Sequence, residues 1–581
     1  VRGFSVKFYT NEGVFDLVGN NMPVFFIQDA IKFPDLIHAV KPEQDNEIPQ
    51  AASAHDTFWD FISTMPESMH MIMWVMSDRA IPRSLRMMEG FGVHTFRLIN
   101  EKNNSVFVKF HWKPLLGVHS VVWDEAQIIS GKDSDFHRRD LWEAIESGSF
   151  PEWELGLQIV EEKDEFKFDF DLLDPTKLIP EELVPVRRIG KLTLNRNPDN
   201  FFAETEQVAF HPGHIVPGID FSNDPLLQGR LFSYTDTQLS RLGSPNFHEI
   251  PINRSISPIH NNQRDGHMRQ TINVGKTSYD PNTLNSGCPF QAKAIDGGFT
   301  SFAERIDARK IRARSKSFFD HFSQAKLFFN SQSAPEKDHI ISALTFELGK
   351  LKADVIRKRM IGLLTQVDMD LAKRVATGLG MDVTKPEQPI NHSIPADGNP
   401  KNFQPVFVKQ TIEKSAALSM ENTVKNSIKT RKIAILATDG VDDASLNSMK
   451  NTLVSAGAVT KIVASHLGSI KSKNGTAIKA DESLLTTSPV LFDAVYIPGG
   501  KESIDAFFKC PETMDFVKLA YKHFKPIAVN GEGVALFKAA CTVKSPDGKD
   551  INLSEEGVAI NKTPNDFVKL IMKHRFWDRA L

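Results

Sequence analysis

The sequence is poor in cysteine and has no long apolar run, and each shortage excludes a class of protein. Its 581 residues include only three cysteines, Cys288, Cys510 and Cys541, which are too few and too far apart for a disulfide framework or a cysteine-based zinc site. No apolar run approaches the roughly 20 residues that a membrane-spanning helix needs. Because so few cysteines suit a reducing compartment, we expect a cytoplasmic location.

The excess of one sign of charge over the other is also small. Lys and Arg total 69 against 72 Asp and Glu, a net charge of −3, which excludes a broadly basic nucleic-acid binder. We therefore expect neither a nucleic acid nor a membrane among the partners. Tyrosine is rare too, with 5 Tyr against 42 Phe, so a functional tyrosine would have few candidates.

Residues 1–250 have the alternation of half-buried strands. The clearest segments are Val1–Thr10, Val106–Phe110, the run Trp153, Leu155, Leu157 and Ile159, and Lys191–Leu194. Short strands with long connections predict a closed antiparallel barrel or a sandwich. Because Val1 opens inside a strand, we also expect that this chain is an N-terminally shortened piece.

The next three segments differ in style. Residues 251–310 are irregular and rich in Pro, Asn, Gly and Arg, which is typical of an arm that wraps another subunit. Residues 311–385 have helical spacing, and a helix start is predicted at Ser333–Glu336. The apolar positions expected to follow it on one face are Ile340, Ile341, Leu344, Leu348, Leu351 and Val355. Residues 386–430 contain several prolines and read as a linker.

Residues 431–581 alternate short apolar strands with helical segments. The strands are predicted at Ile433–Ala437, Thr460–Ala464, Ala494–Ile497 and Ile527–Val529. Strands that alternate with helices indicate a separate domain with a parallel, doubly wound sheet. The chain as a whole therefore reads as an α+β multidomain protein.

The segment Arg230–Gln238, RLFSYTDTQ, is the sharpest chemical signal. On a helix Arg230 and Tyr234 would lie four apart on one face, within side-chain reach. A guanidinium beside a phenol favours the phenolate, a hard anionic ligand suited to ferric iron. By spacing alone, an ordinary Arg–Tyr contact on a helix remains the alternative.

This stretch matches the haem-ligand signature of the haem catalases at every position. Arg2–Tyr9, Leu17–Asn21 and Leu194–Pro198 also resemble catalase segments, in the expected order. With the added C-terminal domain, the resemblance covers nearly the whole chain. The resemblance is to the large-subunit clade, whose members have a barrel core followed by a flavodoxin-like domain.

The resemblance implies a haem site. Tyr234 would be the axial ligand of the iron, Arg230 its charge partner, and Arg241 a partner of a haem propionate. Asn20 would be the distal asparagine that holds a peroxide oxygen. The residues expected to line the distal pocket, its channel or the haem edge are Val18, Phe25, Phe26, Phe33 and His94. In some members a histidine at the position of His211 is covalently bonded to the proximal tyrosine, so a His211–Tyr234 link is a candidate.

The implied function is that of a catalase, which converts two hydrogen peroxide molecules to two water and one dioxygen and so protects against oxidative stress. The haem would be b or d, and the assembly a homotetramer. Gln238, where small-subunit catalases carry His, is typical of the large-subunit clade. The alternatives are a haem enzyme of catalase-like fold that rearranges hydroperoxides, and a non-enzymatic haem-binding protein.

One catalase residue has no counterpart in the sequence. The distal histidine of the family precedes the segment that Val1–Tyr9 matches, and the first histidine here is His38. We therefore expect residues 1–581 alone to lack catalase activity, which an oxygen-evolution assay would test.

The C-terminal domain resembles the class I glutamine-amidotransferase-like superfamily. Active members carry a nucleophilic cysteine on the tight turn after a strand. Here that turn reads Ala528–Gly533 and contains no cysteine; Cys541 comes too late and Cys510 belongs to another loop. A vestigial, structural role is therefore expected for this domain.

Overall fold

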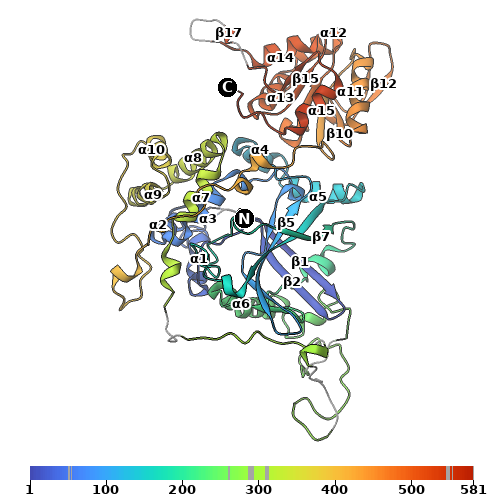
Figure 1. Cartoon of the computed structure of the whole chain (residues 1–581). Helices are drawn as coiled ribbons and strands as arrows, with labels where there is room; N and C mark the ends of the chain where they lie inside the picture. Colours follow the sequence, from blue (N-terminus) through green and yellow to red (C-terminus); the bar gives the residue numbers. More distant parts are fainter. Residues whose placement is uncertain are drawn as a thin grey trace.

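The computed structural model describes residues 1–49, 53, 55–258, 262–284, 293–296, 298–307, 313–544, 550–551 and 554–579. An antiparallel sheet, a helical region beside it and a C-terminal α/β region succeed one another along the chain (Figure 1). In Figure 1 the C-terminal region, orange to red, lies at the end of the molecule near α4 and α5. Cys288 lies outside the described residues.

The first sheet is antiparallel and is built mainly from the first 221 residues. Its strands are β1 (Gly3–Thr10), β2 (Gly13–Asn20), β3 (Gly90–Phe91), β4 (Phe96–Ile99), β5 (Ser105–Pro114), β6 (Glu152–Glu161), β7 (Arg187–Thr193) and β8 (Ile219–Phe221). The order is β1-β2-β3-β5-β4-β8, with β6 between β5 and β7. The predicted strands are confirmed. Within the described residues β1 pairs only with β2, and β8 only with β4, so the sheet is an open half-barrel there rather than the closed barrel we expected.

Helices surround this sheet and supply one wall of the site. They are α1 (Phe33–Val40), α2 (His55–Thr64), α3 (Met69–Val75), α4 (Trp123–Lys132), α5 (Phe136–Glu146) and α6 (Pro225–Leu242). At the start of α6, Asp224 accepts hydrogen bonds from the backbone N–H groups of Leu226 and Leu227 at 2.9 and 3.0 Å, and Pro225 stands in the first turn. The helix ends at Gly243, whose φ of 74° is easy only for glycine. Sequence-local signals thus set both ends of α6.

The helical region contains α7 (Ser323–Ser331), α8 (Ala334–Gly349), α9 (Asp354–Val367) and α10 (Met369–Gly378). The predicted helix start is confirmed: Ser333 caps α8, and its N–H donates to Glu336 at 2.8 Å. The assignment of Val355 to the same apolar face is wrong. The helix ends at Gly349, and Val355 belongs to α9 with 49% of its surface exposed.

The described parts of two segments contain little regular secondary structure. The described part of 251–310 has no strand and only the 3-10 turn Ala294–Asp296, and in Figure 1 it runs outside the body of the molecule. The segment 386–430 contains short 3-10 turns at Pro400–Phe403, Ala416–Leu418 and Met420–Asn422.

The C-terminal sheet is parallel, in the order β13-β10-β9-β14-β15-β18. These strands are β9 (Lys432–Leu436), β10 (Val459–Ala464), β13 (Glu482–Ser483), β14 (Ala494–Ile497), β15 (Ile527–Val529) and β18 (Val558–Ile560). Two antiparallel pairs lie outside it: β11 (Gly468–Lys471) with β12 (Ala477–Ala480), and β16 (Val543–Lys544) with β17 (Asp550–Ile551).

Helices cover both faces of this sheet. They are α11 (Asp443–Ser455), α12 (Lys501–Phe508), α13 (Pro511–Lys522), α14 (Gly533–Cys541) and α15 (Pro564–Met572). Ile433 and Ile435 of β9 pack with α11 and α15, whereas Ala434 and Leu436 pack with α12, α13 and α14. Alternate residues of one strand thus enter two different cores, which is why its sequence is continuously apolar.

Candidate active site

The α6 helix brings Arg230 and Tyr234 together as the i, i+4 spacing predicts. Nη2 of Arg230 donates to the Tyr234 phenol oxygen at 2.7 Å, and the guanidinium lies 4.8 Å from the centre of the phenol ring. The same Nη2 also donates to the backbone carbonyl of Val18 at 3.1 Å. Within the described residues the phenol oxygen has no other hydrogen-bond partner. One arginine therefore joins α6, the phenol and β2.

The end of β2 forms the wall opposite this pair. Val18 and Asn20 stand two apart, so their side chains point to the same face of the strand. Asn20 is half-buried, and its Oδ1 accepts the N–H of Met22 at 2.7 Å. Its neighbour Asn21 is buried and bonds Arg2 and Arg79 backbone groups. Of the two asparagines, only Asn20 has an amide NH₂ with no partner in the described residues.

The three phenylalanines predicted near the pocket lie in the segment after β2. Phe25 and Phe26 are half-buried and meet edge to face with ring centres 5.7 Å apart. Both pack against a small apolar cluster that includes Leu226 of α6. Phe33 begins α1 and is exposed. Phe25 and Phe26 therefore pack beside α6, and Phe33 lies at the surface. Their place in a haem pocket remains a prediction.

His94 forms a buried pair with the residue that caps α6. Its Nδ1–H donates to Asp224 at 2.6 Å, and both side chains are almost fully buried. Burial lowers the pKa of His94 in spite of the opposing effect of Asp224. His94 is thus a neutral ring that fixes the start of the helix that carries Tyr234.

His211 lies beside Tyr234, with the two ring centres 6.1 Å apart. Its Nδ1 accepts the N–H of Gly213 at 2.7 Å, and its Nε2 contacts Thr235 Oγ1 at 2.7 Å. Burial, and after it His214, lower the pKa of His211 to about 4. The ring is therefore neutral and adjacent to the phenol, and the covalent link remains a prediction.

Arg241, predicted to hold a propionate, lies one helical turn beyond Gln238. Its Nη1 and Nη2 donate to the backbone carbonyls of Glu206 and Val208, each at 2.6 Å. Nη2 also reaches Gln238 Oε1 at 2.6 Å. The guanidinium is thus already fixed against the 206–208 backbone, and its role toward a propionate remains a prediction.

Two buried carboxylates near this site were not predicted. Asp16 of β2 pairs with Lys7 at 2.8 Å and with His214 at 2.8 Å, and also accepts the N–H of His211. Asp224 is the other. A signal for Asp224 exists in the sequence, because Asp followed by Pro is a common helix start. Asp16 has no such local signal, since its partners come from residues far along the chain.

The chemistry of Tyr234 and its surroundings fits the ligand of a haem iron. A half-buried phenol oxygen that accepts one guanidinium hydrogen bond is a hard oxygen donor, and catalases use tyrosine in this role. Arg230 also contacts the backbone carbonyl of Val18, so this apolar residue of β2 lies close to the phenol. Within the described residues, no group of three His, Cys, Asp or Glu is arranged to hold a metal ion.

Comparisons with known proteins decide the family. A family profile described as "Catalase" matches residues 1–286, one described as "Catalase-related immune-responsive" matches 315–379, and "C-terminal domain found in long catalases" matches 429–581. The "Catalase" of Alkalihalophilus pseudofirmus and the "Catalase-2" of Bacillus subtilis are each 54% identical to this chain, covering all of it and 81% of their own length. The "Catalase HPII" of Pseudomonas putida is also 54% identical and is covered over 78% of its length.

The chain belongs to the catalase family. The predicted resemblance to a large-subunit catalase is confirmed, and so is the expectation of an enzyme. Relatives named catalase over the whole chain do not favour the hydroperoxide-rearranging alternative or a non-enzymatic haem-binding protein. Haem is the cofactor that the family implies.

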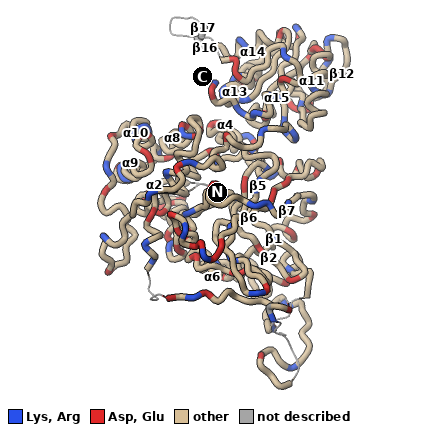
Figure 2. Tube along the Cα trace, viewed as in Figure 1, with Lys and Arg blue, Asp and Glu red and all other residues tan. Residues whose placement is uncertain are grey.

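Two further observations concern helix length and the distribution of charge. Among the described residues no helix is long and apolar enough to cross a membrane. In the view of Figure 2, residues of both charge signs are interspersed along the trace, which agrees with the near-zero net charge.

Proposed function

We propose that this catalase disproportionates hydrogen peroxide to water and dioxygen at a haem held by Tyr234. The observation that carries the proposal is the 2.7 Å contact from Arg230 to the Tyr234 phenol, opposite Val18 and Asn20 of β2. The haem iron, when bound, supplies the redox chemistry of peroxide. Arg230 donates to the phenol oxygen and orients it through its second bond to the β2 backbone.

Asn20 is the residue that positions peroxide. Its Oδ1 is held by the N–H of Met22, so the amide plane is fixed and the NH₂ group is directed by that bond. An amide N–H in this position donates to a peroxide oxygen and keeps the molecule in one orientation. Val18, Phe25 and Phe26 form the apolar walls, and Phe33 lies toward the surface end of the channel.

Four further residues complete the assignment. His94 and Asp224 position α6 at the haem edge, and Arg241 binds a propionate with the N–H groups that remain free of the 206–208 carbonyls. His211 is bonded to Tyr234 in the mature enzyme. The haem is b or d; an extracted pyridine haemochrome spectrum distinguishes the two.

The domain assignments form part of the proposal: a catalase core at 1–250, an arm at 251–310, a helical domain at 311–385, a linker at 386–430 and a flavodoxin-like domain at 431–581. The arm suits a homotetramer, and the low cysteine count suits the cytoplasm.

The C-terminal domain is a structural one. The turn after β15 carries Asn530 rather than a cysteine, and Cys541 is buried in α14 with its pKa raised to about 12 by burial. Such a thiol is not a nucleophile at neutral pH.

The test is a single tyrosine substitution with a matched control. Tyr234→Phe removes only the phenol oxygen, so haem titrated into the protein should lose its tyrosinate-type spectrum. Tyr279→Phe makes the same change at an exposed tyrosine and should retain that spectrum. An unchanged tyrosinate-type spectrum in Tyr234→Phe would contradict the assignment.

A further inference from the structure

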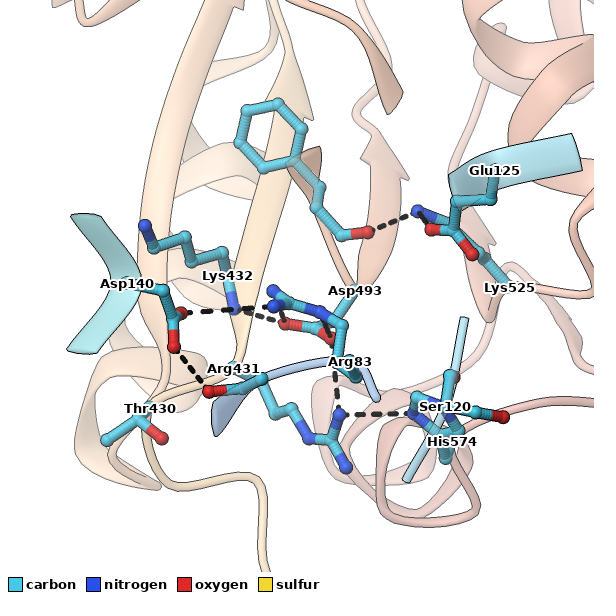
Figure 3. A network of polar contacts seen from close by, with 12 residues as sticks. Arg83, Ser120, Glu125, Asp140, Thr430, Arg431, Lys432, Asp493, Lys525 and His574 are labelled. Atoms are coloured by element: carbon cyan, nitrogen blue, oxygen red, sulfur yellow. Dashed lines mark hydrogen bonds and ion pairs between the residues drawn. The ribbon is translucent and has the colours of Figure 1, made fainter. Parts of the chain in front are cut away.

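The C-terminal domain, residues 431–579, meets the rest of the chain across a buried polar network (Figure 3). Arg83, from the loop before β3, donates Nε and Nη2 to the two carboxylate oxygens of Asp493 at 2.7 and 2.9 Å. Arg431 donates to the same carboxylate at 3.2 Å. The three side chains are almost fully buried. One carboxylate of the C-terminal domain thus serves an arginine from each side of the junction.

Buried cations outnumber buried carboxylates at this junction. A second cluster joins Glu125 of α4 to Arg575, at 3.1 Å, and to Lys525. The buried cations are Arg83, Arg86, Arg431, Lys525 and Arg575, against the carboxylates Glu125, Asp140 and Asp493. Among the residues that the structure describes, Nη1 of Arg83 and Nε of Arg575 have no hydrogen-bond partner. An additional positive charge placed here would therefore find no free counter-charge among these carboxylates.

His574 connects the two sides through both of its ring nitrogens. Nε2 lies 2.6 Å from the backbone carbonyl of Ser120, which belongs to the catalase core, and Nδ1 lies 3.1 Å from Nη1 of Arg431. A guanidinium can only donate, so Nδ1 must accept, and the single ring hydrogen must then be on Nε2 and donate to Ser120. This arrangement exists only for the neutral ring.

The titratable groups that face His574 are cations and another histidine. Arg575 follows it in the chain, Arg431 faces it from the start of β9, and the ring of His119 lies 4.8 Å away on the core side. His119 in turn faces Arg431, Lys425 and Asp493. Burial, followed by Arg575 and Arg431, holds the pKa of His574 well below its ordinary value, and burial and Arg431 do the same for His119.

We propose that His574 is an acid-sensitive latch between the C-terminal domain and the catalase core. The neutral ring docks the domain on Ser120 and orients Arg431 toward Asp493. One proton from solvent converts Nδ1 from an acceptor into a donor that faces the Arg431 guanidinium, and this releases the domain.

The sign and the pH window follow from linkage. Because the pKa values of His574 and His119 are lowered when docked, the docked state binds fewer protons than the released state. Docking is therefore strongest above a pH of about 6.5 and weakens as the pH falls, by up to about tenfold per pH unit for each histidine. Asp493 and Asp140 have lowered pKa values, so they begin to weaken docking only below a pH of about 4. His523 of the C-terminal domain contacts Asp124 of α4 at 2.8 Å, and burial lowers its pKa too. Between these limits His574, His119 and His523 are therefore the groups that drive release.

Hydrogen exchange of the haem-loaded full chain tests the latch. Peptides covering residues 116–125 and 571–577 are followed from about pH 7.5 to 4.5, with rates corrected for intrinsic exchange and far-UV circular dichroism recorded in parallel. In the unmodified protein both peptides should lose protection as the pH falls from about 6.5 to 4.5, while β5 keeps its protection. His574→Gln supplies an acceptor for Arg431 and a donor for Ser120 without a titrating ring. Across that window, the increase in the exchange rate of the two peptides should be about a hundredfold smaller in this variant than in the unmodified protein.

The control is His466→Gln, the same change at an exposed histidine of the same domain, which should follow the unmodified protein. Loss of protection in His574→Gln at the same pH as in the unmodified protein would overturn the latch. So would full protection of both peptides in the unmodified protein until the circular dichroism signal collapses, a result that needs no variant.

Discussion

A single carboxylate, Asp224, links the proposed iron ligand to the core of the first sheet. Its Oδ1 caps α6 through the N–H groups of Leu226 and Leu227, and its Oδ2 accepts the Nδ1–H of His94. Tyr234 lies ten residues further along the same helix. The direction of the helix axis, and with it the position of the phenol, thus depends on a group that does not touch the phenol.

Asp224→Ala should therefore loosen α6. Loss of the cap costs about 0.5–2 kcal/mol, and an unpaired buried His94 nitrogen adds about 1–3 kcal/mol. Exchange of the α6 amides should accelerate by about tenfold or more, and haem affinity should fall with it. Asp236→Ala, at an exposed position of the same helix, is the control and should leave exchange unchanged. Equal exchange in the two variants would show that Asp224 does not hold the helix.

The residue scale also shows what sequence can and cannot predict about the site. The contact from Arg230 to Tyr234 is local, so the i, i+4 spacing predicted it. The arrangement of Val18 opposite Arg230 depends on a contact across 212 residues, and no local pattern contains it. The buried pair of His94 and Asp224 is separated by 130 residues and was missed for the same reason.

At the scale of single elements, α8 is a helix whose start was predicted from the sequence and whose apolar face packs into the core. Leu344 is fully buried in the cluster that joins α8 to α7, α9 and the Trp59–Trp74 region. The predicted continuation of this face to Val355 was wrong because α8 ends at Gly349 and a new helix, α9, begins at Asp354. Periodicity alone did not reveal that break, although Gly349 is a poor helix former and Asp354 is a residue type common at helix starts.

Leu344→Ala should destabilise the helical region. Truncating a buried leucine leaves a cavity and costs about 2–5 kcal/mol. Val355→Ala makes a similar truncation at a half-exposed position and should cost less than about 0.5 kcal/mol. Thermal unfolding followed by circular dichroism compares the two. Equal shifts of the melting temperature would mean that the cluster around Leu344 is not the core of this region.

The sheets show the same limit at a larger scale. Alternation predicted β1, β5 and β6, and continuous apolar runs predicted β9, β14 and β15, because each pattern reports how many faces of a strand are buried. Whether the first sheet closes into a barrel depends on how its edge strands meet, which no single strand encodes. The closed barrel was therefore the part of the fold prediction that the described residues do not show.

For the whole molecule, the junction around Asp493 decides whether the C-terminal domain and the core behave as one unit. Burial opposes the charge of Asp493, yet Arg83 and Arg431 hold its pKa below the ordinary range. Its contribution is therefore complete above a pH of about 4 and is lost as the pH falls toward the lowered pKa. That window lies below the one in which His574 and His119 act, so the two sources of acid sensitivity can be separated.

Asp493→Ala leaves Arg83 and Arg431 buried without their shared carboxylate, which should cost about 3–5 kcal/mol at neutral pH. Scanning calorimetry should then resolve a C-terminal transition that melts earlier than the core. Because the carboxylate is absent, the variant should also lose the steep decline below a pH of about 4 while keeping the histidine-driven decline above it. Asp505→Ala, which removes an exposed partner of Lys501 in the same domain, should melt like the unmodified protein. A single unshifted transition in Asp493→Ala would show that the domain is held by its apolar contacts, and the excess of buried cations would then be tolerated without this carboxylate.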